Sequence, residues 1–260
     1  AAGPTRVTPL RYRPGNRCVL RYDIGESAYF GKVLSGGRAA ALATIAAELA
    51  AKQLTVPLVA FAPEWQLVVQ ADAAGPRAEA ADLESCGRLL ARLHAGATPP
   101  GPSCSLHEDA AELVDLVPSM RYVGICAEEF AGAVDRLRSW PSPEHRTVPS
   151  HGAFRLNQVH CGPGGPVMID LDSFGWAEPE RDVANLLAYL HWRGMRRGAD
   201  QREGRAAFLA GYGAGLDGGR LRAFEAVSLL KIAGRRIRRF KTDEWLRLPD
   251  LIGAATGLLE

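Results

Sequence analysis

Short apolar stretches separated by turn-forming residues dominate the first seventy residues of the chain. Five of these stretches predict β-strands: residues 8–13, 17–22, 28–34, 56–61 and 66–70. Gly15 lies in a Pro-Gly-Asn turn between the first two stretches, which therefore predict a hairpin. Residues 38–52 are rich in alanine and place Leu42, Ile45 and Leu49 at helical spacing, so they predict a helix.

The chain after residue 80 has mainly helical spacing. Apolar residues recur at helical intervals in six segments: residues 83–96, 107–139, 181–193, 201–213, 219–240 and 248–259. A polar loop at 97–105 and a short apolar strand at 167–171 interrupt them. We therefore predict an α+β fold, with a strand-rich lobe over residues 1–75 and a larger helical lobe over residues 76–260.

The composition is typical of a globular protein large enough for two lobes. The 260 residues are 47% hydrophobic and carry a formal net charge of +2, which excludes a disordered chain and does not favour nucleic-acid binding. We find no secretory segment and no apolar run of the roughly eighteen residues that a bilayer span needs. Five scattered cysteines without CxxC spacing argue against disulfides and structural zinc. We expect a cytoplasmic protein.

Three motifs that carry chemistry follow one another in the second half of the chain. They are Ser-His-Gly-Ala at 150–153, Ile-Asp-Leu-Asp at 169–172 and Pro-Glu-Arg-Asp-Val-Ala at 179–184. In this order and at these intervals, they resemble the catalytic loop, metal-binding segment and following helix of aminoglycoside phosphotransferases and their choline-kinase-like relatives. In that family the pattern is His-Gly-Asp, four residues and Asn, then a strand ending in Ile-Asp, then Pro-x-x-Asp-Leu-Ala.

The resemblance implies the bilobal fold of protein kinases, with a small antiparallel sheet and one helix in the N-terminal lobe. Residues 1–75 would bind nucleotide, and residues 76–260 would supply the catalytic loop and the substrate-binding helices. The implied cofactors are ATP or GTP and Mg²⁺, and the implied acceptor is a hydroxyl of a sugar, an antibiotic or a modified peptide. Phosphoryl transfer spreads negative charge, so such a site needs fixed positive charge, metal ligands and alignment.

The nucleotide-binding residues implied by the resemblance lie in the first lobe. Lys32, on the third predicted strand, would pair with the phosphates, although it could also be an exposed strand lysine. Glu48 is the only carboxylate between Lys32 and Lys52 and would orient Lys32. Arg17 follows the predicted turn and could reach phosphates or be a solvated turn residue. The base would lie against the segment that contains Gln70 and Asp72.

The implied metal-binding residues lie in the second lobe. Asp170 would hold Mg²⁺, because an unpaired carboxylate at the end of an apolar strand is costly to bury. Gln158 occupies the position of a second metal ligand, and a shift of one residue would give that role to Asn157. Asp172 is either a further ligand or faces solvent. His151 belongs to the catalytic loop, where a histidine more often packs than acts as a base.

Ala153 departs from the family pattern, because it stands where the family has its catalytic aspartate. Alanine cannot orient a substrate hydroxyl or accept its proton. Three explanations remain open: a natural pseudokinase that binds nucleotide without turnover, slow transfer with Asp172 or a substrate group as substitute, or an aspartate that has been replaced by alanine. Loss of a general base typically costs about a hundred- to ten-thousand-fold in rate. The substitution therefore concerns rate more than binding.

The charge distribution gives two opposing indications about the acceptor. Six acidic residues favour a cationic or polyhydroxyl acceptor, although such a run is usually a solvated face: Glu108, Asp109, Glu112, Asp115, Glu128 and Glu129. Six basic residues could bind an anionic peptide or a sugar phosphate: Lys231, Arg235, Arg236, Arg238, Arg239 and Lys241. The near-zero net charge and the absence of interleaved aromatics argue against nucleic acid. A pseudokinase would instead need a protein partner.

Overall fold

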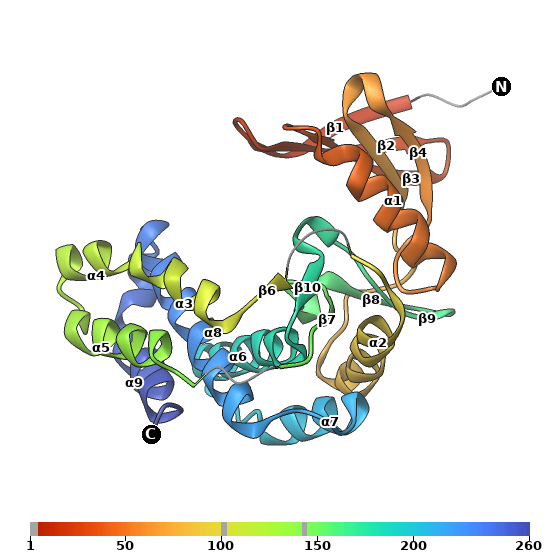
Figure 1. Ribbon diagram of the computed structural model, residues 1–260. Coiled ribbons are helices and arrows are strands. Elements are labelled where there is room, and N and C mark those ends of the chain that lie inside the picture. Colours follow the sequence, from red (N-terminus) through yellow and green to blue (C-terminus); the bar gives the residue numbers. More distant parts are fainter. Residues whose placement is uncertain (1–4, 100–102, 142–144) are drawn as a thin grey trace.

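A computed structural model describes residues 5–99, 103–141 and 145–260 of the chain. Its first part is an antiparallel five-stranded sheet with the strand order β1-β2-β3-β5-β4, packed against one helix (Figure 1). The elements are β1 (Thr5–Arg13), β2 (Arg17–Ile24), β3 (Ser27–Leu34), α1 (Arg38–Ala51), β4 (Leu58–Ala62) and β5 (Leu67–Ala71). The predicted hairpin between β1 and β2 is confirmed, and Gly15 gives its turn the positive φ of 66°.

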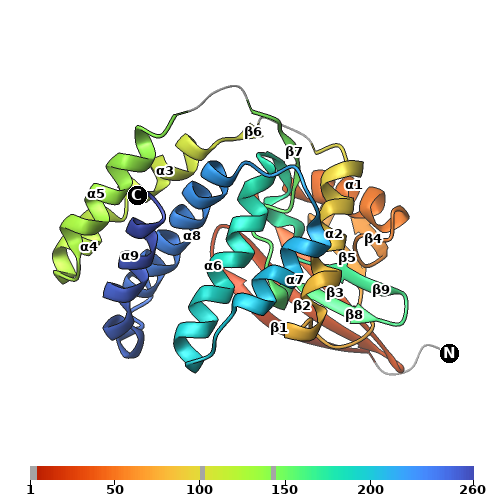
Figure 2. The same cartoon turned by 90° about the horizontal axis from the view of Figure 1, so that it is seen from below.

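The second part is mainly helical (Figure 2). Its helices are α2 (Leu83–Gly96), α3 (Leu106–Val114), α4 (Val117–Val123), α5 (Ala127–Arg138), α6 (Pro179–Arg197), α7 (Arg202–Tyr212), α8 (Gly218–Arg238) and α9 (Leu248–Gly257). A three-stranded sheet contains β6 (Ser103–Cys104), β10 (Gly175–Ala177) and β7 (Val148–Ser150), and a separate hairpin contains β8 (Val159–Gly162) and β9 (Gly165–Met168). The two lobes together confirm the predicted bilobal, kinase-like α+β fold.

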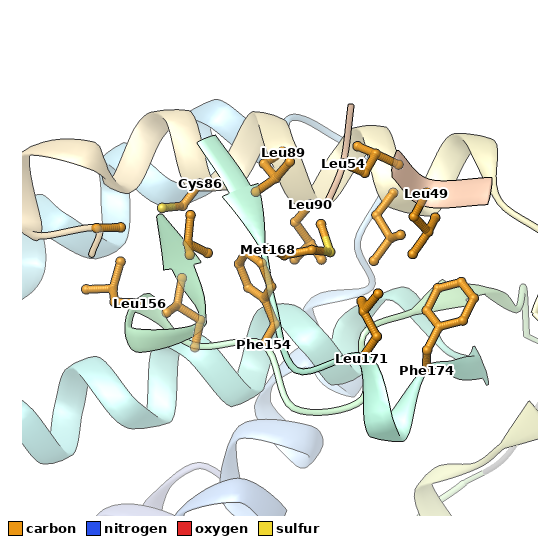
Figure 3. Packing of buried hydrophobic residues seen from close by; sticks show 14 of the residues in the cluster. Leu49, Leu54, Cys86, Leu89, Leu90, Phe154, Leu156, Met168, Leu171 and Phe174 are labelled. Carbon is orange, nitrogen blue, oxygen red and sulfur yellow. The ribbon is translucent and has the colours of Figure 1, made fainter. Parts of the chain in front are cut away.

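One hydrophobic core joins the two lobes (Figure 3). Leu49 and Leu54, from the end of α1 and the segment after it, pack in the same cluster as Leu90 of α2 and Met168 of β9. Full burial of one such leucine stabilises the fold by roughly 1.5–3 kcal/mol. The hydroxyl of Thr55 also donates to the Met168 carbonyl at 2.6 Å. The small lobe is therefore anchored directly to the strand that precedes Asp170.

A second hydrophobic core lies among helices α3, α4, α5, α6, α8 and α9. It contains Phe130 of α5 and Phe224 of α8. The chain predicted as one helical stretch over 107–139 forms three helices here. Gly124 and Cys126 between α4 and α5 have positive φ angles of 73° and 47°, which end one helix before the next begins. Within the described residues, no helix has the length and apolarity needed to cross a bilayer.

Several predicted boundaries differ from the structure. The strand predicted over 167–171 ends at Met168, and Asp170 has a left-handed φ of 67°. The short strands β6, β7, β8 and β10 were not expected, since two to four residues carry no readable alternation. Part of the predicted loop at 97–105 is strand β6, and residues 100–102 of that loop lie outside the described residues. All five cysteines are free thiols, as expected.

Candidate active site

The loop of residues 151–158 is held by one buried carboxylate. Asp182, in the first turn of α6, accepts hydrogen bonds from the backbone N–H of His151 at 2.6 Å and of Gly152 at 2.9 Å. It also accepts from the hydroxyl of Ser150 at 2.9 Å and from Nε2 of His94 at 3.3 Å. Burial opposes its ionisation, but the hydrogen bond from His94 and the nearby charge of Arg181 lower the pKa of Asp182 to about 2. Asp182 therefore braces this loop.

The first two residues of the loop, His151 and Gly152, are tightly packed beside Asp182. Gly152 has φ 76°, and a Cβ there would lie 2.2 Å from the carbonyl oxygen of Ser173, so only glycine fits. His151 is fully buried and donates from Nε2 to the Ile169 carbonyl at 2.9 Å. Burial lowers the pKa of His151, so the ring is neutral. His151 therefore packs in the core, and its Nδ1 is a buried acceptor without a donor among the described residues.

Two cations from the sheet meet two carboxylates from the segment after β9. Lys32 Nζ, on β3, donates to Asp170 Oδ1 at 2.9 Å and to Asp172 Oδ1 at 2.5 Å. Arg17 Nη1, on β2, lies 3.2 Å from Asp170 Oδ1 and also forms an ion pair with Asp172. Residues more than 130 positions apart in the sequence therefore converge where the two lobes meet. We name these four residues the cleft cluster.

The cleft cluster is partly buried, and this changes its protonation behaviour. Burial would raise the pKa of Asp170, but Lys32 and Arg17 lower it well below its usual value. Burial lowers the pKa of Lys32 against the opposing effect of Asp170. The left-handed backbone of Asp170 turns the chain so that Asp172 reaches the same cations two residues later. Asp170 is therefore a permanent anion at neutral pH, as a ligand for a divalent cation must be.

Gln158 lies beside the cleft cluster. Its side chain is buried, and Nε2 lies 3.4 Å from Asp170 Oδ2. The neighbouring Asn157 is exposed. The geometry therefore brings Gln158, and not Asn157, next to Asp170.

Comparison with known proteins identifies the family. The sequence profile described as "Phosphotransferase enzyme family" matches residues 31–224, which is most of the chain. The chain belongs to this phosphotransferase family. The match extends from the strand that carries Lys32 to the first third of α8 and includes the loop, Asp182 and Asp170. A search of curated proteins gives no match.

Solved structures show the same fold at low sequence identity. A spectinomycin phosphotransferase in complex with ADP and spectinomycin is 12% identical, with a TM-score of 0.68 over 97% of this chain and 92% of that chain. Choline kinase LicA from Streptococcus pneumoniae is 13% identical, with a TM-score of 0.69 over 98% and 92%. Amicoumacin kinase hAmiN, in complex with AMP-PNP, Ca²⁺ and Ami, is 17% identical, with a TM-score of 0.70 over 96% and 87%. Two of these similar structures are thus complexes with adenine nucleotides.

The predicted partnership of Lys32 with Glu48 is wrong for this structure. Glu48 Oε1 accepts from Lys52 Nζ at 2.6 Å, one helical turn away on α1. Within the described part of the chain, Lys32 forms ion pairs with Asp170 and Asp172 and none with Glu48. The reason is geometric, because the Glu48 carboxylate is paired with Lys52 on α1, while Asp170 and Asp172 lie 2.9 Å and 2.5 Å from Lys32 Nζ. This family member therefore positions Lys32 through the opposite lobe.

The residues predicted to contact the base lie at the connection between the lobes. Gln70 is on β5, and its Nε2 lies 3.4 Å from the Val56 carbonyl. Asp72 is exposed, and its backbone N–H donates to the Ala28 carbonyl at 3.2 Å. Their contact with a base remains a prediction.

Ala153 follows Gly152 at a partly exposed position of the loop. Its methyl group neither donates nor accepts a hydrogen bond, and its carbonyl accepts from Arg155 Nε at 3.3 Å. Arg155 Nε also lies 3.5 Å from Gln158 Oε1, which places a guanidinium beside the metal-binding candidates. Sequence reasoning missed Arg155, because a single arginine in a loop carries no periodic signal.

A buried charge network behind the loop was also missed. Asp109 of α3 accepts from Arg181 Nε at 2.6 Å and from Lys231 Nζ at 2.6 Å. Burial opposes the charge of Asp109, but Arg181 and Lys231 lower its pKa. Lys231 also pairs with Glu112 at 2.6 Å. Asp109, Glu112 and Lys231 stand in the acidic and basic runs of the sequence, but which charges meet depends on how α3 packs against α8.

Proposed function

We propose that this chain is an ATP- and Mg²⁺-dependent phosphotransferase that transfers the γ-phosphoryl group to a hydroxyl of a small molecule. The observation that carries the proposal is the convergence of Lys32 and Arg17 on Asp170, next to Gln158 and a braced loop, in a member of a phosphotransferase family. Fixed cations, oxygen ligands and a rigid loop are what phosphoryl transfer needs from a protein.

The residues of the cleft cluster fit a nucleotide phosphate and its cation. Among the described residues, Arg17 Nε is a buried donor without an acceptor, which suits an additional anion beside this guanidinium. Asp170 and Gln158 offer oxygen atoms, the ligands that Mg²⁺ prefers. No cluster of three or more histidines, cysteines or carboxylates is arranged for a metal in the described ranges, and Mg²⁺ commonly needs only one or two carboxylates together with substrate phosphates.

Asp170 and Gln158 would hold Mg²⁺, which would neutralise charge on the transferred phosphoryl group. Lys32 and Arg17 would bind the phosphates, since both converge on Asp170, the proposed metal ligand. The acceptor oxygen would form its bond to the γ-phosphorus as the bond to the β–γ bridging oxygen breaks, which leaves ADP and releases the hydroxyl proton. Asp172 would keep Lys32 and Arg17 oriented, because both form ion pairs with it.

Ala153 supports a second candidate function, a nucleotide-binding pseudokinase. We take Ala153 to stand at the position of the family's catalytic aspartate, where a methyl group cannot accept the hydroxyl proton. If Asp172 were the substitute base, it would have to leave its two ion pairs with Lys32 and Arg17. Without a catalytic base, phosphoryl transfer would depend on positioning and electrostatics alone. We therefore expect the transfer rate to be low.

A phosphotransfer assay with the Ala153→Asp variant distinguishes the two candidates. ATP consumption is measured with a panel of hydroxyl acceptors for the wild type, Ala153→Asp and Ala153→Asp/Asp170→Asn. For an enzyme, we expect Ala153→Asp to raise the rate by roughly a hundred-fold or more and Asp170→Asn to abolish the gain. If the wild type binds MgATP but none of the three proteins consumes ATP, the chain is a pseudokinase. Absence of MgATP binding in the wild type would contradict both.

A further inference from the structure

A pocket of about 470 Å³ opens beside the loop of residues 151–158, and arginines dominate its lining. We name it the arginine pocket. Its lining includes one carboxylate, Glu79, and six arginines: Arg77, Arg155, Arg193, Arg196, Arg197 and Arg236. Arg155 is shared with the candidate active site, because its Nε also contacts the Ala153 carbonyl and the Gln158 side chain. The arginine pocket therefore reaches the place where the acceptor hydroxyl would be presented.

Many of these positive charges have no internal partner. Arg196 and Arg236 share Glu244, at 3.3 Å and 2.7 Å, while Arg193, Arg197 and Arg77 form no ion pair within the described ranges. Arg193 and Arg197 are one helical turn apart on α6, so they face the same way. Several like charges around one pocket repel each other, and this repulsion is relieved when a multivalent anion binds among them.

The aromatic residues of the pocket also suit an anion. Tyr189 accepts hydrogen bonds at its hydroxyl from Arg155 at 3.1 Å and from Arg235 at 2.8 Å. Burial would raise the pKa of this phenol, but Arg235 and Arg155 lower it. Trp192 is 3% exposed, and its indole N–H is a buried donor without an acceptor among the described residues. The pocket lining thus includes one donor, the Trp192 indole N–H, that no described group satisfies.

At least three of the six acidic residues of the sequence that would attract a cationic acceptor are engaged by groups of the protein itself. Asp109 is neutralised by Arg181 and Lys231, and Glu112 also pairs with Lys231. Glu108 caps the start of α3 through Ser105. In the arginine pocket itself, a polycation would meet six guanidinium groups and one carboxylate.

We propose that the arginine pocket binds the anionic group of the acceptor, so that the substrate is a small hydroxyl compound that already carries a phosphate monoester. This inference rests on the proposed phosphotransferase function and names its substrate class. The planar guanidinium fork matches phosphate oxygens in pairs, and several forks around one pocket suit a dianion. The volume admits a molecule of the size of a sugar phosphate.

A charge series on one sugar scaffold tests the proposal. Isothermal titration calorimetry compares the binding of three sugars. Glucose 6-phosphate carries a dianionic phosphate, glucose is uncharged, and glucosamine carries a cationic ammonium group. We expect saturable binding of glucose 6-phosphate alone and a loss of affinity of roughly tenfold or more in Arg193→Ala/Arg197→Ala. The control Arg202→Ala/Arg222→Ala removes the same charge from two exposed arginines that do not line the pocket.

The outcomes separate this inference from the proposed function. MgATP binding is measured on the same proteins, and Lys32→Ala reports on the cleft cluster. An unchanged affinity for glucose 6-phosphate in Arg193→Ala/Arg197→Ala, an equal loss in the control, or no binding to the wild type overturns the arginine pocket as an acceptor site. Intact sugar-phosphate binding without any MgATP binding would refute the phosphotransferase and leave the anion site standing.

Discussion

Replacing Asp182 by asparagine tests the brace of the loop that carries Ala153. The carboxylate accepts four hydrogen bonds, from Ser150, His151, Gly152 and His94. Asparagine keeps one acceptor oxygen and turns an NH₂ group toward a donor, so at least one buried N–H loses its partner and the remaining bonds lose their charge. An unsatisfied buried donor costs about 1–3 kcal/mol, and each remaining bond loses about 1 kcal/mol when its charged acceptor becomes neutral. We expect a loss of roughly 3–5 kcal/mol in the free energy of unfolding.

The same residue gives a pH signature with a defined sign. The pKa of Asp182 is about 2 in the folded protein, below the value of about 3.9 for an unfolded aspartate. A lowered carboxyl pKa stabilises the fold above the unfolded value, and this stabilisation is lost as the pH falls toward the folded value. Between pH 6 and pH 3, the advantage of the wild type over Asp182→Asn should shrink by about 1 kcal/mol.

Urea unfolding followed by circular dichroism measures both effects. Asp243→Asn is the matched control, since Asp243 is exposed, and we expect it to change stability by less than about 0.5 kcal/mol. A loss below about 1 kcal/mol at pH 7 for Asp182→Asn, or an advantage of the wild type that grows on acidification, would refute the brace.

Two further variants test neighbouring features. Gly152→Ala forces a Cβ against the Ser173 carbonyl at a positive φ, and we expect urea unfolding to show a loss of at least about 2 kcal/mol; wild-type stability would show that the loop can shift freely. Glu48→Gln should change the dissociation constant of MgATP by less than about twofold in a calorimetric titration, because Glu48 pairs with Lys52. A tenfold loss of MgATP affinity would instead support the predicted role of Glu48 in orienting Lys32.

Sequence spacing predicted the long elements of the fold, because long amphipathic segments repeat their pattern several times. The helix α1 and the hairpin at Gly15 were found this way. The strands β6, β7 and β10 were not found, since two or three residues between other elements show no period. The separation of α4 from α5 within residues 107–139 depends on the left-handed backbone at Gly124 and Cys126, and a cysteine gives no warning of such a conformation.

The candidate site was predicted through its motifs rather than through its contacts. The motif order placed Lys32 and Asp170 in one cleft, and the structure brings them within 2.9 Å. The predicted pairing of Glu48 with Lys32 was wrong, because the carboxylate nearest to Lys32 in the sequence is not the one nearest to it in space. The role of Arg17 was open in the sequence, since only the packing of one lobe on the other brings β2 to Asp172.

The measurement that tests the nucleotide cleft most directly is a calorimetric titration with MgATP, repeated with MgGTP. Wild type is compared with Lys32→Ala and with the control Lys52→Ala, which removes a lysine that pairs with Glu48 outside the cleft cluster. We expect saturable binding by the wild type and the control, and a loss of roughly tenfold to a hundredfold in Lys32→Ala. No saturable binding by the wild type, or equal affinity in Lys32→Ala, would contradict a nucleotide cleft built on Lys32 and Asp170.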